Sequence, residues 1–106
     1  MYFLVLAWDG IDQGAVSRRD AARESHMASI TKLFQAGHVI LGAGLLDEDG
    51  VVRGSIVVTD YPTRADVDAY IEEEPLQTAG VWETVSVHPL RLPDMYIKGL
   101  AAGSPS

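Results

Sequence analysis

The sequence contains no cysteine. This absence excludes a disulfide framework, a thiolate zinc site and a cysteine nucleophile. Basic residues are also scarce, with 8 Lys and Arg against 15 Asp and Glu and a formal net charge of −7. Because no cluster of Lys or Arg offsets this charge, phosphate groups repel the chain. We therefore expect neither nucleic acid nor an anionic membrane as a partner.

Long hydrophobic runs are missing as well. The longest apolar stretch, Met1–Trp8, is too short to cross a bilayer and lacks the basic region and cleavage site of a signal peptide. We therefore expect a cytoplasmic protein. The length of 106 residues, 47% of them hydrophobic, predicts one domain with a substantial core. We place this domain at residues 1–92 and a tail, disordered near its end, at residues 93–106.

The order of the predicted elements is β-α-β-β-α-β. Thr63 is a suitable N-cap for the second helix, Gly37 is a suitable residue after the end of the first, and Pro75 breaks the helical pattern. This order predicts an α+β, ferredoxin-like fold, in which an antiparallel sheet carries both helices on one face. The strands are predicted at residues 1–8, 39–46, 51–59 and 81–90, the helices at 18–36 and 64–73, and a loop at 9–17.

The strands are apolar on both of their faces. In the first strand Tyr2, Leu4, Leu6 and Trp8 alternate with Phe3, Val5 and Ala7. A sheet covered by helices on one side only is expected to have a polar opposite face. A large exposed apolar face is typical of an interface. We therefore expect a homodimer, in which a second copy covers the free face and the two sheets close a barrel.

His26 lies on the stripe of the first helix that is predicted to be buried, together with Ala22, Ile30 and Leu33. One interpretation is a packed core histidine. The other is an acid–base group in a cavity, which requires a carboxylate that orients the ring. Two carboxylates lie at suitable places in the predicted topology. Asp9 ends the first strand, and Glu74 follows the second helix.

Several short motifs occur in a fixed order along the chain and resemble the YCII-related (YciI-like) family from the first strand to about Arg91. These are Asp9, Arg23 with His26, Gly37 through Leu45, Gly54 with Ser55, and Ala79, Gly80 and Val81. The resemblance implies a dimeric α/β-barrel and a pocket with a His–Asp pair. Most members have no defined reaction. One is similar to a cofactor-independent dehydrochlorinase that acts on a chlorinated hydroxyhydroquinone through a histidine and an aspartate.

The chain departs from the family pattern at two places. Glu74-Pro75 stands where the family has Asp-Pro, so the carboxylate is retained on a side chain one methylene longer. Gly44-Leu45 lacks the proline of the family's Gly-Pro-Leu segment. Because catalysis depends on geometry at the level of about 1 Å, these changes prevent the direct transfer of a particular substrate.

Two classes of function follow. The first is a small cofactor-independent enzyme in which His26, with Asp9 or Glu74, carries out elimination, isomerisation or tautomerisation of an oxygenated, aromatic or enolic substrate. The alternative is a non-catalytic dimeric module that binds a small molecule or docks a partner. Arg23, Arg19 and Ser55 are the candidate substrate-binding residues, although the arginines could instead pair with nearby carboxylates. No pair of histidines has the spacing of metal ligands, so we expect no metal site.

Overall fold

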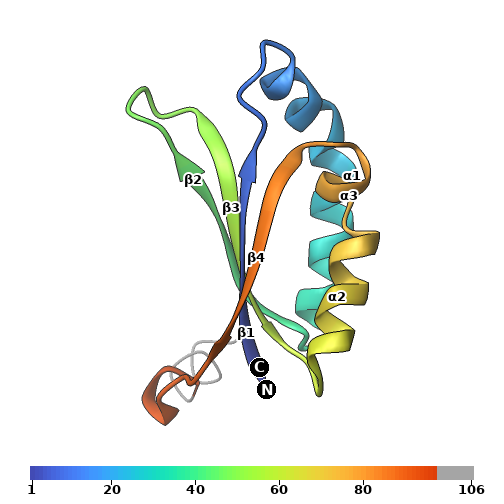
Figure 1. Ribbon diagram of the computed structural model, residues 1–106. Helices are drawn as coiled ribbons and strands as arrows, with labels where there is room; N and C mark the ends of the chain where they lie inside the picture. Colours follow the sequence, from blue (N-terminus) through green and yellow to red (C-terminus); the bar gives the residue numbers. More distant parts are fainter. Residues whose placement is uncertain (98–106) are drawn as a thin grey trace.

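A computed structural model describes residues 1–97 of the protein. The four strands form one antiparallel sheet in the order β2-β3-β1-β4, and the helices α1, α2 and α3 lie on one face of it (Figure 1). The ferredoxin-like arrangement predicted from the sequence is confirmed. The elements are β1 (Tyr2–Asp9), α1 (Ala15–Gln35), β2 (Val39–Leu46), β3 (Val52–Asp60), α2 (Arg64–Glu73), α3 (Pro75–Thr78) and β4 (Trp82–Leu90).

The first helix begins three residues earlier than predicted, at Ala15 instead of Arg18. Its N-cap, Gly14, has no side chain that could cap the helix. Asp12 replaces this cap, because its carboxylate accepts hydrogen bonds from the Gly14 N–H and from both terminal nitrogens of Arg18. The predicted loop therefore ends at Gly14.

The second helix has the predicted bounds and the predicted cap. The Thr63 hydroxyl accepts from the Asp66 N–H, and the Asp66 carboxylate accepts from the Thr63 N–H, which completes a capping box. Pro75 ends this helical run as expected, but it also begins the short helix α3, because the first turn of a helix needs no N–H from that position. The Glu74 residue between the two helices is thereby held in an extended conformation.

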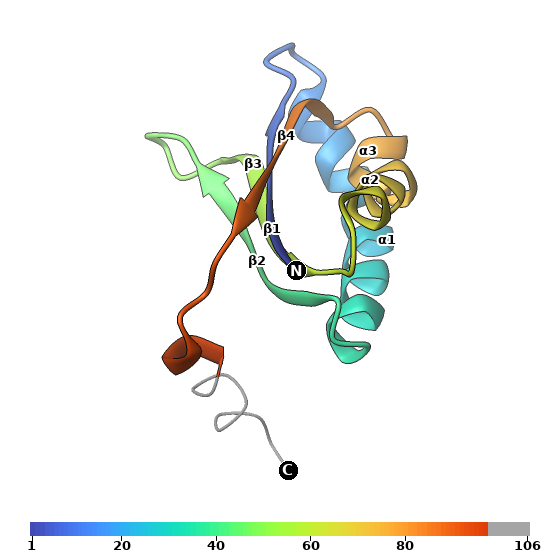
Figure 2. The same ribbon diagram turned by 60° about the horizontal axis from the view of Figure 1, so that its bottom comes forward.

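Side chains along β1 alternate between the helical layer and the opposite face. Phe3, Val5 and Ala7 are buried beneath the helices, whereas Trp8 on the opposite face is 48% exposed. Figure 2 shows the helices stacked against this one side. The core under the helices consists of Phe3, Val5, Ala7, Ala22, Val39, Val57, Val67, Tyr70, Leu76, Val81 and Trp82.

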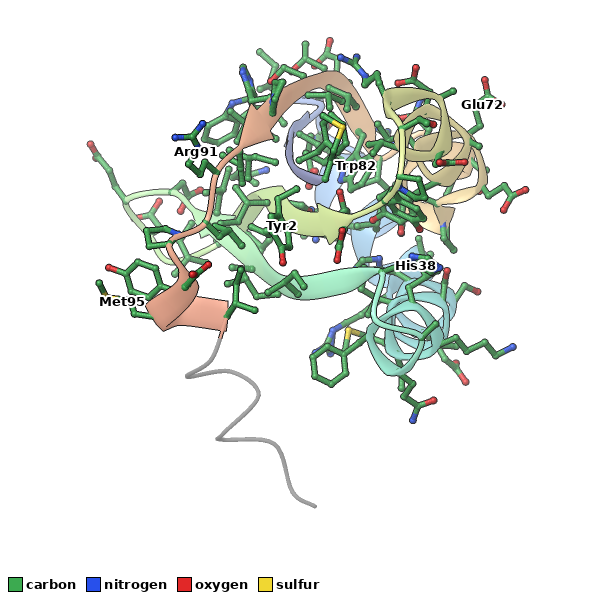
Figure 3. The ribbon with its side chains drawn as sticks, turned by 90° about the horizontal axis from the view of Figure 1, so that it is seen from below. Tyr2, His38, Glu72, Trp82, Arg91 and Met95 are labelled. Carbon is green, nitrogen blue, oxygen red and sulfur yellow. The ribbon has the colours of Figure 1, made fainter. Side chains whose placement is uncertain are left out.

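The face of the sheet away from the helices has no covering layer within residues 1–97. Leu6 pairs across the strands with Ile56, and Leu4 pairs with Val58, so apolar side chains continue from β1 to β3. The segment after β4, with Met95, extends away from the helices, as Figure 3 shows from below. The predicted disorder near the end of the chain concerns residues outside those described. No helix within residues 1–97 is long and apolar enough to cross a membrane.

The ion pair at the start of α1 gives the first prediction. The hydrogen bond from Arg18 is the main cause that lowers the pKa of Asp12 from 3.8 to about 2. We expect the Arg18→Gln variant to return the pKa of Asp12 toward 3.8 in an NMR titration of the side-chain carboxyl carbons. Because the pKa is lower in the folded state, the pair stabilises the fold above about pH 3.8 and loses this effect as the pH falls through about 2.

Arg64→Gln is the matched control, since Arg64 is an exposed helical arginine that binds Asp68 and not Asp12. This variant should leave the titration of Asp12 unchanged. If Arg18→Gln also leaves it unchanged, the assignment of the low pKa to Arg18 is wrong.

Candidate functional site

Two polar residues occupy the stripe of α1 that faces the sheet. Ala15, Arg19, Ala22, His26 and Ile30 recur at intervals of three or four residues, which places them on one side of the helix. Ala15 and Ala22 are buried. Arg19 and His26 are only partly buried, with side chains 16% and 17% exposed. The helix therefore presents a guanidinium and an imidazole between small apolar contacts.

His26 binds Glu74. The distance from His26 Nδ1 to Glu74 Oε1 is 2.5 Å. Glu74 is buried, and its side chain has no solvent exposure. The same carboxylate accepts from the Leu76 N–H at 3.2 Å through Oε1 and from the Tyr70 hydroxyl at 3.2 Å through Oε2. A buried carboxyl group requires such hydrogen-bond partners, and here they come from α1, α2 and α3.

Tyr70 acts as a donor at this site. Burial raises the pKa of the Tyr70 hydroxyl, and the negative charge and hydrogen bond of Glu74 raise it further. The hydroxyl therefore keeps its proton across the ordinary pH range and donates it to the carboxylate. The sequence analysis missed this residue, although it lies only four residues before Glu74, which directly follows α2.

Asp9 belongs to a second polar cluster and does not contact His26. It is the next residue on the helix-facing side of β1 after Ala7, so the alternation of the strand places it beneath α1. Its two oxygens accept from Arg19 Nε at 2.6 Å and Arg19 Nη2 at 3.1 Å. Two carboxylates were considered as the partner of His26. Glu74 binds the ring, and Asp9 binds Arg19 instead.

Ser55 joins this second cluster through the register of the sheet. Ser55 pairs with Ala7 and Trp82 pairs with Asp9, so all of these residues meet on the helix-facing side. The Ser55 hydroxyl accepts from Arg19 Nη2 at 2.7 Å and from Trp82 Nε1 at 3.3 Å. Trp82 was not a predicted site residue, because only the register reveals its position.

Gly54 explains the Gly-Ser pair in this strand. A Cβ atom at Gly54 would lie 2.7 Å from the Ala7 carbonyl oxygen and 2.9 Å from the Trp8 ring. Real side chains do not tolerate such contacts with backbone, so glycine lets β1 and β3 approach closely beside Ser55. The motif therefore serves the packing that positions the hydroxyl.

A cavity of about 660 Å³ opens between α1 and the β2–β3 hairpin. Its polar lining includes Arg19, Arg23, His26 and Ser55, whereas Asp9 and Glu74 stand behind these groups. Arg23 is exposed and has no ion-pair partner within residues 1–97. The remaining wall is mainly apolar and includes Met27, Ile30, Phe34, Val39 and Val57. The imidazole thus faces a hollow, with a carboxylate fixing its other side.

Comparison with solved structures identifies proteins with this fold. A 5-chloro-2-hydroxyhydroquinone dehydrochlorinase (TftG) from Burkholderia phenoliruptrix AC1100, in complex with 2,5-dihydroxybenzoquinone, superimposes with a TM-score of 0.76 and 20% identity. The alignment covers 90% of this chain and 98% of that chain. At this identity the likeness shows that the two proteins share a fold.

Two further structures are less similar. A dimeric ferredoxin-like protein of unknown function from Jannaschia sp. CCS1 aligns over 86% of this chain and 98% of its own, with 16% identity and a TM-score of 0.48. Protein Atu4242 from Agrobacterium tumefaciens aligns over 86% and 92%, with 13% identity and a TM-score of 0.47.

Sequence comparison identifies the family. No curated protein matches the chain. The profile of the YCII-related domain matches residues 1–91, which includes every strand and helix described above. The chain therefore belongs to the YCII-related domain family.

Proposed function

We propose that the protein is a small enzyme in which His26 transfers protons to and from a bound substrate. One observation carries this proposal. The imidazole binds a fully buried carboxylate at 2.5 Å through Nδ1, and the same side chain lines a cavity of about 660 Å³. A carboxylate that orients a histidine whose other nitrogen is available is the arrangement that general acid–base catalysis requires.

The hydrogen bonds of Glu74 determine which ring nitrogen of His26 carries the proton. The Leu76 N–H can only donate to this carboxylate, and the Tyr70 hydroxyl donates to its other oxygen, which supports the ionised form. An ionised carboxylate must then accept from Nδ1, so the neutral ring carries its proton there. Nε2 is left unprotonated and can accept a proton from a substrate. After this transfer the charged imidazole is stabilised by the negative charge of Glu74. Glu74 is therefore a positioning residue, and His26 is the proposed catalytic one.

The reaction class follows from what a single acid–base group can do. Such a group increases the reaction rate by about 10²–10⁴-fold, which is sufficient for elimination, isomerisation or tautomerisation of an activated molecule. Arg23 at the rim and Ser55 in the wall supply donors for an oxygenated substrate, aromatic or enolic. The dehydrochlorination carried out by the similar Burkholderia protein is one example of this class. Arg19 is mainly engaged by Asp9, and it supports Ser55.

The proposed assembly is a homodimer through the free face of the sheet. Leu6 and Ile56 form part of an apolar surface over β1 and β3 that has no cover within residues 1–97, and Trp8 is 48% exposed beside them. A second copy that packs its sheet against this surface would remove it from water and close a barrel. The cytoplasmic location, the boundary at residue 92 and the lack of nucleic acid partners stay predictions from the sequence.

The first test of this function measures proton transfer. The substrates are 5-chloro-2-hydroxyhydroquinone, followed by chloride release, and enolisable cyclic diketones, followed by ¹H NMR of deuterium exchange in D₂O. We expect turnover of at least one compound and a loss of about 10²–10⁴-fold in His26→Gln. Glu74→Gln keeps the shape of the side chain and removes its charge. It should lower the rate and shift the ring toward a mixture of tautomers in ¹⁵N NMR.

His38→Gln is the matched control, because His38 stacks on Tyr61 outside the cavity and should leave the rate unchanged. A wild-type protein that binds these compounds without turnover would contradict the proposal and favour a binding module. Equal rates in wild type and His26→Gln would remove His26 from the mechanism.

A second prediction concerns the donor behind the carboxylate. Because the pKa of Tyr70 is raised above its ordinary value of 10.0, Tyr70 stabilises the fold below about pH 10, and this effect is lost as the pH rises further. Tyr70→Phe should cost about 1–3 kcal/mol at neutral pH, since Oε2 of Glu74 loses its donor. The difference between wild type and variant in urea denaturation should shrink above pH 10. A constant difference up to pH 12 would contradict this role.

A third prediction tests the dimer. Leu6→Glu places a charge in the centre of the free face and should convert a dimer into a monomer in sedimentation at low micromolar concentration. Ile11→Glu introduces the same charge at a side chain that is 94% exposed in the loop before α1, and it should stay dimeric. A monomeric wild-type protein under these conditions would refute the proposed assembly.

A further inference from the structure

We infer that the ligand of this cavity is amphipathic, with an oxygenated head that becomes an oxyanion beside His26 and an apolar substituent that lies along α1. This inference rests on the proposed function and specifies the substrate class of the same site. Three features of the cavity carry it: the hydrogen-bonding state of Ser55, the charge balance at the polar end, and an exposed apolar wall.

Ser55 can only donate to a ligand. A hydroxyl has one proton and two acceptor positions. Arg19 Nη2 and Trp82 Nε1 are both obligatory donors, and they occupy both acceptor positions of the Ser55 oxygen, at 2.7 Å and 3.3 Å. Within residues 1–97 the Ser55 hydroxyl donates no hydrogen bond, and Ser55 lines the cavity. The remaining proton is therefore available to a carbonyl or oxyanion of the ligand.

The charges at this end suit a ligand that is neutral before the reaction. Arg19 is balanced by Asp9, and Arg23 shares the lining with Asp20. When a hydroxyl of the ligand gives its proton to Nε2 of His26, the electron pair stays on the ligand oxygen. The imidazolium is then neutralised by Glu74, and the new oxyanion can accept from Ser55 and Arg23. These donors stabilise the charged form more than the neutral one, which lowers the barrier.

The other end of the cavity is an apolar trough. Met27 and Phe34 line it, although they are 47% and 60% exposed. Phe34 lies eight residues beyond His26, which is about 12 Å along the helix axis. Exposed apolar side chains that continue from a polar pocket are typical of a ligand site. A single hydroxylated ring at the polar end would leave this trough empty.

The size of the cavity agrees with a longer ligand. Cavities of roughly 300–1,000 Å³ accommodate drug-sized molecules, and this one measures about 660 Å³. An alkyl or aryl substituent of several carbons on the ring would cover Met27 and Phe34. The oxygenated head then takes part in proton transfer, and the contacts of the substituent with the apolar wall supply the binding affinity.

The test uses 2,5-dihydroxybenzoquinone, whose ionised enol oxygens represent the oxyanion state of the ligand, and its 3-ethyl, 3-butyl and 3-hexyl derivatives, with binding measured by calorimetry on the full chain. We expect the Kd to fall by about twofold to fourfold for each added methylene, because each buried methylene leaves water. Phe34→Ser should abolish most of this gain and leave the Kd of the parent compound unchanged. Arg23→Gln should weaken every member of the series by the same factor.

Leu46→Ser is the control, since Leu46 is 63% exposed on β2 and does not line the cavity. It should leave the series unchanged. If the parent binds and the derivatives bind no better, the inference is wrong while the proposed function stands. A second copy of the chain filling the trough would give that result. If no member of the series binds, the inference and the proposed function fail together.

Discussion

A carboxylate with no access to water must be surrounded by donors, and Glu74 is such a carboxylate. Its hydrogen-bond partners are the ring of His26, the hydroxyl of Tyr70 and the N–H of Leu76, one from each of α1, α2 and α3. The need to satisfy this one group therefore ties the junction of α2 and α3 to the middle of α1. It also holds the imidazole in a single orientation, so the helical packing and the state of the proposed catalytic residue have the same origin.

The register of the sheet fixes the position of a second polar side chain of α1, two helical turns from His26. Arg19 lies seven residues before His26 on the same stripe of α1, about 10.5 Å along the axis. It is held by Asp9 and Ser55, which the pairing of β1 with β3 brings beneath the helix. Ala22 between these two anchors is buried and small, so the helix can lie close to the sheet. The cavity opens where this contact ends, toward the β2–β3 hairpin.

Local sequence signals predicted the elements whose ends depend on local chemistry. Thr63 starts α2 at the expected residue because its cap and the Asp66 partner are neighbours in the chain. Gly37 follows α1 with a φ of 83°, a conformation that favours glycine. The start of α1 was predicted three residues late. The carboxylate that replaces its cap belongs to Asp12 and is held by Arg18. Arg18 in turn donates to the carbonyl of Gly80, which is distant in the sequence.

The sequence by itself determined the order of the strands and helices, the apolar residues on both sides of β1, the family and the small set of polar residues from which a site could be built. These properties depend on spacing along one element, which the chain encodes directly. The tertiary structure alone decided that Glu74 binds His26 while Asp9 binds Arg19. It also decided that Ser55 accepts from Trp82. These pairings depend on strand register and on how helices meet across 10 to 48 residues of chain. Many long-range contacts set these distances together, and no local pattern records them.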